Sequence, residues 1–356
     1  MPGRARARTI AEVYRRFGEA DAGTSPLHGR VAVALSGSDA ALRAIGSAPA
    51  RKRHPAVILA ALHDLALAGH APALAAAYAA GDGDAAADAA IDALLRLTGP
   101  VVDLAVHRRP RTDETGRGAV LYPAIAEAAR RVGANAVGLI DVGCSAGLNL
   151  TVDRVGITYD NGDPLGDPSS PVQVSASTVG GRPVPTQALP EVVAKVGVDL
   201  DPLDVTDPDD ARWLRACLPP DEPARLARLE AEIALAATDP PLLLRGDAVD
   251  VLPDAVALVP ADALPVVTTT WALSRFPPES RMHFLHRLHE AAADRPVAWV
   301  SVEGVGVAPS VPTLGDRRAS GHSIIGVAVS HGSTRHAEAV GRCWSRGRLL
   351  AWLAEP

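Results

Sequence analysis

The stretch LIDVGCSAGLNL, from Leu139 to Leu150, combines residue types that could hold a small ligand. It reads as a short apolar strand that ends in Asp141, a turn that contains Gly143 and Gly147, and the start of a helix. Glycine permits positive φ and the close approach of a ligand, and the first N–H groups of a helix are available to donate hydrogen bonds. The same pattern also suits a strand-to-helix turn that binds nothing, so this stretch alone leaves both interpretations open.

The spacing of the turn favours one kind of ligand over another. A dinucleotide fingerprint requires glycines in the register G-x-G-x-x-G, whereas this chain has the order Asp-x-Gly-x-Ser-x-Gly. That order is closer to the S-adenosylmethionine (SAM) turn of class I methyltransferases. We therefore predict a SAM-binding turn that consists of Asp141, Gly143, Ser145, Ala146 and Gly147.

Acidic residues also follow the next two predicted strands. The segment VGVDLDPLDV carries Asp199 and Asp201 at the end of the second strand, and RGDA carries Asp247 at the end of the third. A carboxylate at that edge accepts two hydrogen bonds from a ribose diol, and Asp247 is placed to accept one from an adenine amino group. The alternative for each acid is a helix N-cap, which aspartate commonly forms after a strand. Three acids at three successive strand ends favour the cofactor prediction.

The candidate catalytic residues follow the later strands. Methyl transfer depends mainly on positioning, and a base is needed only when the acceptor arrives protonated. Glu303 ends the fifth predicted strand, where burial would raise its pKa and suit it to proton transfer. An ion pair with an arginine is the alternative for Glu303. His331, in the C-terminal loop, is the second candidate base, and a structural turn histidine is its alternative.

Two further segments predict contacts with the substrate. TTTWALSRF, at the end of the fourth predicted strand, supplies Thr270, Trp271 and Ser274. TDETGR precedes a predicted helix and supplies Glu114 and Arg117, which would close the pocket or bind an acidic substrate through Arg117. A helix-capping role is the alternative for this second segment.

A run of histidines and one cysteine also have spacings or positions that could serve a site. His283, His286 and His289 recur three residues apart on a predicted helix, a spacing that can hold a metal, but no set of acids and cysteines completes such a site. Cys144 lies within the glycine turn, where a helix N-terminus lowers a thiol pKa, although a small side chain that simply fits explains it as well. We therefore predict no metal centre.

The composition narrows the class of partner. The 356 residues carry a formal net charge of −6 and include three cysteines that lie far apart. The acidic balance argues against a nucleic-acid partner, and the cysteine spacing argues against a disulfide framework. We expect no signal peptide, and the apolar segment PAVILAALHDLALAG reads as a buried helix rather than a membrane span. The predictions are a cytoplasmic protein and a small-molecule substrate, without a membrane partner and with a homo-oligomer left open.

Two kinds of pattern divide the chain. Residues 1–107 read as helices throughout. Residues 108–356 alternate strands with helices after a helix that ends at Gly133, which favours a mostly parallel sheet covered on both faces. Residues 151–190 are rich in Gly, Pro and Ser, and they read as an insertion of turns and short antiparallel strands. The predicted fold is α/β, with a Rossmann-like, seven-stranded, mostly parallel sheet and an all-helical N-terminal region.

The chain resembles the domain of unknown function 2332 family. Members of that family look like class I SAM-dependent methyltransferases with an added helical N-terminal region, so the resemblance implies that fold and SAM as the cofactor. The stretches that carry it run in order along nearly the whole chain: SPLHGRVA, TDETGRGAVLYPAI, LIDVGCSAGLNLTVDR, VGVDLDPLDVTDPDDARWLRACLPPDEPARLARL, LRGDA, RPVAWVSVEG and His331–Gly332.

The chain also departs from the family pattern at three places. Asp113 stands where an asparagine is usual, and LPPDE, at Leu218, replaces a Trp-Pro-Asp run. After the fourth strand, TTTWALS replaces a His-Ser pair. The last departure falls where substrate would bind, so it implies a substrate different from that of typical members.

Three functions follow from these patterns. We favour a SAM-dependent, methyltransferase-like enzyme that acts on a small molecule. The second is the same fold used for non-methylating chemistry, an intramolecular displacement or elimination on a small metabolite, which Ser145 in place of a turn glycine would suit. The third is a non-catalytic, degenerate module that binds a partner through its alanine-rich helices. Tight binding of SAM separates the first function from the other two.

Overall fold

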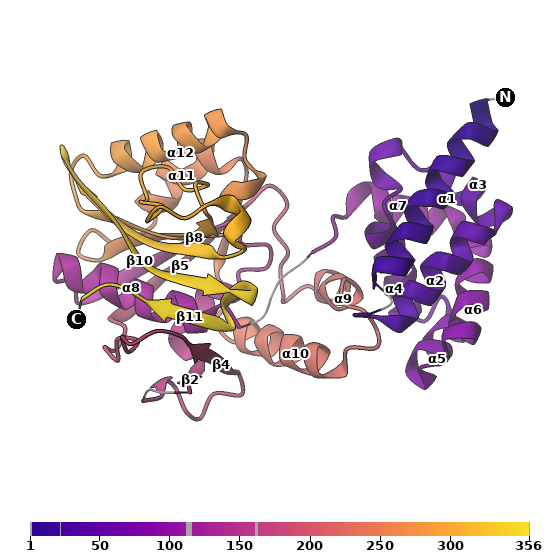
Figure 1. Ribbon diagram of the computed structural model, residues 1–356, viewed down its shortest axis with the longest axis horizontal. Helices are drawn as coiled ribbons and strands as arrows, with labels where there is room; N and C mark the ends of the chain where they lie inside the picture. Colours follow the sequence, from indigo (N-terminus) through magenta and orange to yellow (C-terminus); the bar gives the residue numbers. More distant parts are fainter. Residues whose placement is uncertain (1, 22, 112–115, 161–162, 356) are drawn as a thin grey trace. The chain divides into compact units, whose positions relative to one another are not determined.

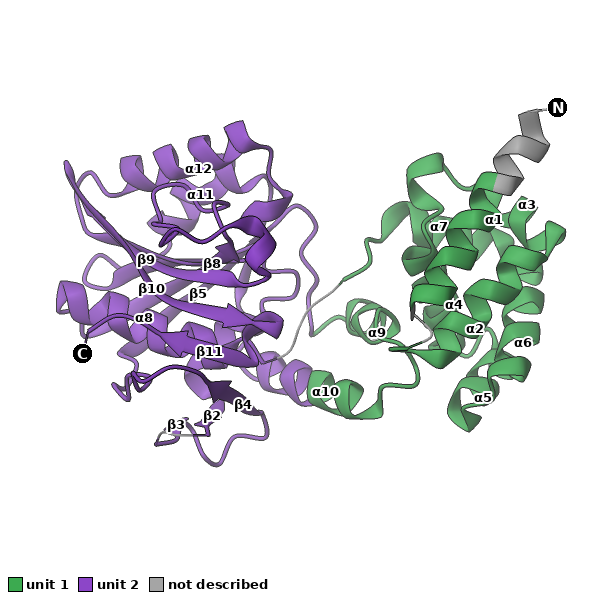
Figure 2. Ribbon diagram, viewed as in Figure 1, with its two compact units in different colours: residues 1–113, 206–230 green, residues 114–205, 231–356 purple. Residues whose placement is uncertain are grey.

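The computed structural model describes residues 2–21, 23–111, 116–160 and 163–355, with the side chains of 2–8 and 21 excepted. The chain divides into two compact units (Figure 2). Unit 1 comprises residues 1–113 and 206–230, and unit 2 comprises residues 114–205 and 231–356. The sequence placed the boundary at 107 and assigned 206–230 to the α/β domain, whereas the structure returns this segment to the helical unit.

Unit 1 consists of helices, as the sequence predicted. Proline occupies the first turn of α2, α4, α5 and α9, where its missing N–H costs nothing because that group has no partner within a helix. The elements of unit 1 are α1 (Pro2–Asp21), α2 (Pro26–Gly37), α3 (Asp39–Ser47), η1 (Ala50–Lys52), α4 (Pro55–Leu67), α5 (Pro72–Ala80), α6 (Gly83–Arg96), α7 (Thr98–His107), α9 (Pro208–Ala216) and the first half of α10 (Pro223–Ala237), all visible in Figure 1.

Helix α4 is the centre of unit 1, since nearly all of its residues are buried. It was predicted as a buried helix that breaks before a second one, and α5 follows it after a short turn. In the described part of the chain no single helix has both the length and the apolarity to cross a membrane, although α4 and α5 together, bent by 101° at their break, meet those two criteria.

Polar contacts attach residues 206–230 to the N-terminal helices. The hydroxyl of Ser25, the N-cap of α2, donates to Asp221 at 2.6 Å, and the guanidinium of Arg212 on α9 donates to the buried Asp64 of α4 at 3.1 Å. These partners lie about 150 to 200 positions apart in the sequence. A local pattern does not reveal such pairs, which is why the sequence left this segment in the wrong unit.

Unit 2 contains the sheet and the helices that cover it. Its elements are α8 (Gly118–Val132), β1 (Ala136–Val142), η2 (Leu148–Arg154), β2 (Gly156–Tyr159), β3 (Leu165–Gly166), β4 (Gln173–Thr178), β5 (Glu191–Asp199), the second half of α10, β6 (Leu242–Arg245), α11 (Ala248–Ala257), β7 (Leu264–Thr270), η3 (Leu273–Arg275), α12 (Pro278–Ala291), β8 (Val297–Gly304), η4 (Arg318–Ser320), β9 (Ser323–His331), β10 (Thr334–Trp344), η5 (Ser345–Gly347) and β11 (Leu349–Trp352).

The sheet is larger and more mixed than the sequence predicted. Among the described residues it has eleven strands in the order β3-β2-β4-β11-β10-β9-β8-β7-β1-β5-β6. The strands β6, β5, β1, β7 and β8 are mutually parallel, and β9, β10 and β11 continue from them by antiparallel pairing. The α/β prediction is therefore confirmed, and the seven-stranded, mostly parallel sheet is wrong.

Three of the four additional strands come from the insertion predicted at 151–190. Its strands β2 and β3 are antiparallel as expected, but β4 pairs in parallel with both β2 and β11. The insertion thereby extends the sheet at one edge instead of looping out. A strand at a sheet edge offers unpaired backbone groups to any nearby segment, and the sequence pattern does not say which segment takes them.

The side on which the chain adds successive parallel strands to the sheet changes at β1. From β1 the chain adds β5 and then β6 on one side, and it then crosses back to add β7 and β8 on the other side. Open α/β sheets bind ligands in the crevice outside the carboxyl ends of the strands at this kind of reversal. The carboxyl ends of β1 and β7 therefore mark the most favourable place for a site in unit 2.

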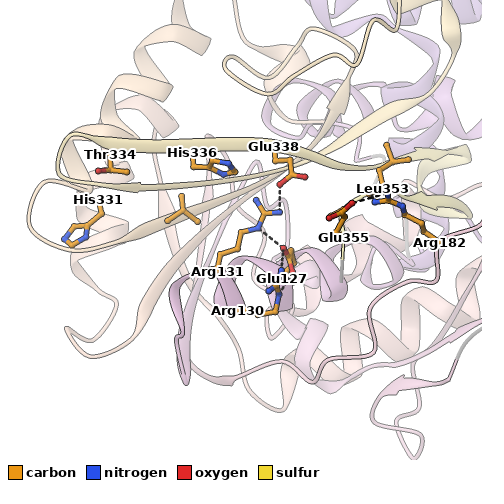
Figure 3. A pocket seen from close by; sticks show the side chains of 12 residues that line it. Glu127, Arg130, Arg131, Arg182, His331, Thr334, His336, Glu338, Leu353 and Glu355 are labelled. Carbon is orange, nitrogen blue, oxygen red and sulfur yellow. Dashed lines mark hydrogen bonds and ion pairs between the residues drawn. The ribbon is translucent and has the colours of Figure 1, made fainter.

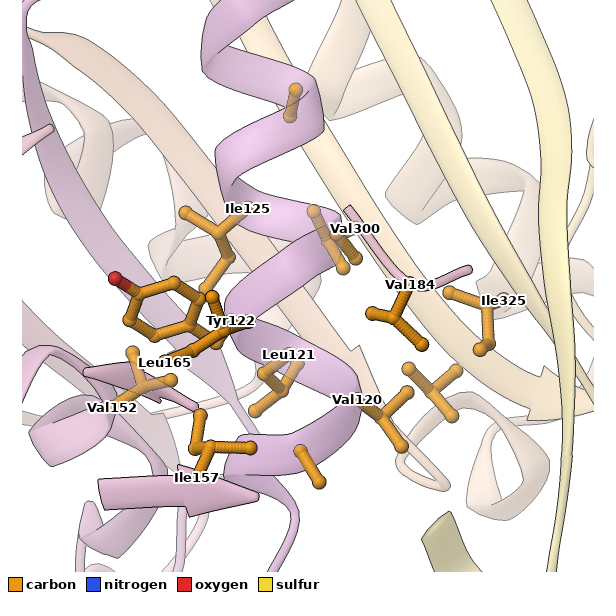
Figure 4. Packing of buried hydrophobic residues seen from close by; sticks show 14 of the residues in the cluster. Val120, Leu121, Tyr122, Ile125, Val152, Ile157, Leu165, Val184, Val300 and Ile325 are labelled. Atoms are coloured by element: carbon orange, nitrogen blue, oxygen red, sulfur yellow. The ribbon is translucent and has the colours of Figure 1, made fainter. Parts of the chain in front are cut away.

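Two apolar cores sandwich the parallel strands. Helix α8 covers one face, and α11 and α12 cover the other (Figure 1). Figure 4 shows Leu121 and Ile125 of α8 in the same buried cluster as Val300 of β8 and Ile325 of β9. Burial of one such side chain stabilises the fold by about 1.5 to 3 kcal/mol. Because helices pack on both faces of the parallel strands, the carboxyl ends of these strands are a favourable place for a ligand.

Candidate functional site

The predicted glycine turn has the backbone that its residues require. Gly143, Ser145 and Gly147 all have positive φ, at 73°, 54° and 72°. A Cβ on Gly143 would lie 3.0 Å from the Cβ of Ala272, and one on Gly147 would lie 2.7 Å from Pro241. Glycine is therefore needed at both positions for packing, whereas Ser145 holds a left-handed conformation that costs a non-glycine residue about 1 to 2 kcal/mol.

One hydrogen bond joins this turn to the second predicted acid. The backbone N–H of Ser145 donates to Asp199 at 3.0 Å, and the backbone N–H of Asp201 donates to the other oxygen of Asp199 at 2.9 Å. The Asp201 carboxylate forms an ion pair with Arg245 at 2.7 Å. The structure thus brings Ser145 and Asp199 together, with Ala146 buried beneath the turn.

Asp247 caps a helix, which the sequence analysis gave as the alternative to ligand binding. It is the N-cap of α11, and its carboxylate accepts a hydrogen bond from the backbone N–H of Val249 at 2.9 Å. The residue is exposed at the end of β6, which is the neighbour of β5 in the sheet. Asp141, Asp199 and Asp247 therefore end three adjacent strands, as the sequence predicted.

Asp141 is the centre of a buried polar network. Only 1% of its surface is exposed, and its two oxygens accept hydrogen bonds from Thr268 of β7 at 2.8 Å and from the Asn149 amide at 3.0 Å. The same Asn149 amide lies 3.3 Å from the hydroxyl of Thr270. Sequence reasoning missed Asn149 and Thr268. The signal for Asn149 was its place in the opening stretch, two residues after Gly147.

A cation lies beside this network. Arg117, directly before α8, donates to the hydroxyl of Thr270 at 2.9 Å, and its guanidinium lies 5.2 Å from the ring centroid of Trp271. The Nε of Arg117 is buried without a hydrogen-bond partner among the described residues. The Trp271 indole donates to Ser323 at 2.8 Å, so both partners fix the ring. Glu114, also predicted here, lies outside the described residues.

Glu303 holds the loop that carries Trp271. Only 1% of its surface is exposed, and one carboxyl oxygen accepts hydrogen bonds from the backbone N–H groups of Ala272 and Leu273, both at 2.9 Å. Burial raises the pKa of Glu303 to about 7, although these backbone bonds oppose the shift. Its second oxygen has no hydrogen-bond partner among the described residues. The burial and the raised pKa of Glu303 are those that the sequence predicted, and its carboxyl also fixes the path of the loop; its role as a base stays a prediction. Ser274 is exposed, and its hydroxyl donates to the carbonyl of Trp271.

His331 lies at the wrong edge of the sheet for the predicted role. Strand β9 is antiparallel to β8, so Ser330 pairs with Val297 at the start of β8, while Ile324 pairs with Glu303 near its end. His331, which follows Ser330, is therefore on the amino-terminal edge, opposite the site. The structure therefore does not bring His331, the second candidate base, to the edge that carries Glu303, because the direction of β9 is not readable from its sequence.

The remaining candidates behave as structural residues. Cys144 is buried, and a Cβ on Gly197 of β5 would lie 2.7 Å from its sulfur, so Cys144 fills the space that this glycine leaves. On α12, His286 pairs with Glu290 of the same helix at 3.1 Å. The described residues contain no group of three or more His, Cys, Asp or Glu side chains arranged to hold a metal ion.

The arrangement offers two kinds of chemistry at one edge. On the side of β5 and β6, the partly exposed Asp199 and the exposed Asp247 are acceptors suited to hydroxyl and amino groups. On the side of β7, Arg117 and Trp271 offer a cation stacked on an aromatic face, which suits an anionic or planar group. Asp141 and Asn149 connect the two sides.

Comparison with curated proteins finds no match, and comparison with solved structures finds none either. A family model does match, over residues 11–352, which is nearly the whole chain. Its description is "Uncharacterized protein conserved in bacteria". The chain therefore belongs to the DUF2332 family.

Proposed function

We propose that this protein is a SAM-dependent, methyltransferase-like enzyme that acts on a small molecule. The observation that carries the proposal is the hydrogen bond between the Ser145 N–H and Asp199. It joins a glycine turn after the first parallel strand to an acid after the neighbouring one. A SAM site needs this combination, because the turn gives room for the ligand and the acid accepts hydrogen bonds from the ribose hydroxyls.

The strand order supports the same interpretation. We interpret β6-β5-β1-β7-β8 as a Rossmann-like core, to which the other strands were added at the β8 side. The turn and the acids lie on one side of the reversal at β1, and Arg117 and Trp271 lie next to the end of β7 on the other. That arrangement would separate a cofactor half from a substrate half within one crevice.

Each residue then has a defined task in the proposed enzyme. Asp199 would hold the ribose, and Asp247 would accept from the adenine amino group. Bound SAM supplies an activated methyl group, so the protein must chiefly align the acceptor with it. Arg117 would bind an anionic group of that acceptor, and Glu303 would fix Trp271 beside it through the backbone of Ala272 and Leu273. Asp141 would orient Asn149.

The test is calorimetric titration of the whole protein with SAM. Asp199→Ala should weaken binding by about 10- to 100-fold, because hydrogen bonds to a charged acceptor are lost. Asp201→Ala should weaken it less, since that carboxylate is occupied by Arg245. Asp262→Ala, an exposed acid in the turn before β7, is the matched control and should bind SAM as the wild type does. If the wild type fails to bind at millimolar SAM, the cofactor is removed from the proposal.

If the wild type does not bind SAM, the result would favour the second function, in which the same fold carries out non-methylating chemistry. Ser145 adopts a conformation that glycine would adopt without strain, and both oxygens of Asp141 are bound inside the chain. These features would suit a turn kept for its shape, beside a pocket used for displacement or elimination on a small metabolite. Under either proposal the substrate is a small molecule, and the cytoplasmic location and absence of nucleic-acid partners stay predictions.

A further inference from the structure

Among the cavities of unit 2, two lie against strands β9 and β10, away from the candidate site and at the amino-terminal edge of the sheet. The larger, of about 720 Å³, is drawn in Figure 3 and lies between the end of α8 and the β9–β10 hairpin. Its charges are largely balanced within the protein. Glu127 binds both Arg130 and Arg131, and Arg131 also binds Glu338 at 2.8 Å. Nothing in this balance selects one class of ligand.

The smaller cavity, of about 370 Å³, has a different lining. It lies between α12 and the opposite face of β8, β9 and β10. Its apolar floor includes Leu288 of α12, the buried ring of Trp299 and Ala337 of β10. Ligand sites are usually lined in this way, with an apolar surface and a few polar groups that fix orientation.

The polar groups of this smaller cavity are all neutral or basic. His289 and Arg335 line it with Ser310 and Ser330, and no acidic side chain does. His336 alternates with Arg335 along β10, and its side chain is drawn in the larger cavity (Figure 3). Within the described residues Arg335 makes no ion pair, in contrast to the paired arginines of the larger cavity. Burial lowers the pKa of His289, and the positive charge of Arg335 lowers it further, which indicates that the two side chains share the same space. Although Arg335 is exposed, no acidic side chain lines the cavity beside it, so a negative charge is favoured there over a positive one.

The size of the cavity limits the ligand. A water molecule occupies about 30 Å³ in the liquid, so 370 Å³ holds roughly a dozen groups of that size. A chain or ring of about eight carbons that ends in one charged group fits the volume, and it also fits a lining that is apolar on one part and basic on another.

We propose that this cavity binds a small amphipathic monocarboxylate, with its apolar body against Trp299 and Leu288 and its carboxylate on Arg335. The guanidinium is suited to this task because it offers two parallel donors to a carboxylate. The proposal does not rest on SAM binding, because the cavity lies at the opposite edge of the sheet: Val297, which lines it, begins β8, whereas the candidate site follows the strand ends.

The test uses octanoate as the probe in calorimetric titrations of the full-length protein. The wild type should bind one octanoate saturably, and octylammonium, which has the same chain and the opposite charge, should not bind. Arg335→Gln should weaken octanoate binding tenfold or more, and Arg335→Lys should weaken it less, because the charge is retained. Arg318→Gln, an exposed arginine of η4, is the control and should bind as the wild type does.

A second variant tests the location independently of charge. Ala337→Phe places a ring in the cavity and should abolish octanoate binding while far-ultraviolet circular dichroism and SAM titration remain those of the wild type. The proposal is overturned if the wild type shows no saturable binding of octanoate, or if Arg335→Gln and Ala337→Phe both bind it with wild-type affinity. Neither outcome bears on the SAM proposal, whose variants lie at the other edge.

Discussion

Asp141 and Glu303 are two carboxyl groups at the same edge of one sheet, and each has only 1% of its surface exposed. Asp141 is held by side chains, the hydroxyl of Thr268 and the amide of Asn149. Glu303 is held by backbone N–H groups of the loop after β7. Side-chain donors can rotate toward a ligand, whereas backbone donors fix the path of the chain. If the proposed site binds a ligand, we therefore expect the β1 side to adjust to it and the β8 side to supply a rigid frame.

The largest effect should come from Glu303→Ala. The change leaves the N–H groups of Ala272 and Leu273 buried without their acceptor, at about 1 to 3 kcal/mol each, so we expect a loss of about 4 kcal/mol in the free energy of unfolding. Urea denaturation followed by circular dichroism measures it. Glu279→Ala, on the exposed first turn of α12, is the control. A loss below about 0.5 kcal/mol, typical of surface positions, would contradict the frame role.

The next effect is a pH dependence that belongs to Glu303. Its folded-state pKa, about 7, lies above the ordinary value of 4.5, so the folded state holds the proton more tightly than the unfolded state does. The resulting stability is fully present below pH 4.5 and is lost as the pH rises through 7, with an upper limit of about 3 kcal/mol. Stability of the wild type relative to Glu303→Gln should therefore fall between pH 5 and 8. Parallel pH profiles for the two proteins would mean that the carboxyl does not titrate in this range.

The smallest effects separate the two acids directly. Asp141→Asn replaces one acceptor oxygen with a donor, so Thr268 or Asn149 loses its partner, and we expect a loss of about 1 to 2 kcal/mol. Glu303→Gln keeps the oxygen that accepts both backbone bonds, and at pH 6 it should cost less than about 1 kcal/mol. Thermal unfolding at pH 6 measures which of the two variants, Asp141→Asn or Glu303→Gln, loses more stability. The reverse order would remove the distinction between the two sides.

The strand ends were predictable because the pattern that marks them is local. An apolar run followed by an acid and a glycine turn locates Asp141 and Gly143, and an apolar run followed by an acid locates Asp199. Parallel strands then bring these ends to one edge without further information. The class of fold and the β1–β5 half of the site follow from the sequence for that reason.

The partners of those residues were not predictable, because they depend on pairing over long distances. Thr268 lies 127 positions from the Asp141 that it binds, and nothing local marks it as a donor. The place of His331 at the opposite edge of the sheet was not predictable for a similar reason, since the strand pattern of β9 is equally compatible with either direction. The hydrogen bonds of Glu303 were not predictable, because their donors are backbone N–H groups of a loop whose path the sequence does not give.

The return of residues 206–230 to the helical unit affects the order in which that unit forms during synthesis. Helices α1 to α7 leave the ribosome first, but α9, whose Arg212 binds the buried Asp64, follows only after residues 114–205 have been made. At about 5 to 20 residues per second, that interval lasts roughly 5 to 20 seconds. During this interval, Asp64 lacks its hydrogen bond from Arg212, and Ser25 lacks its acceptor Asp221. The nascent helical unit is thus incomplete long after its first helices exist, and this is the period in which chaperones would engage it.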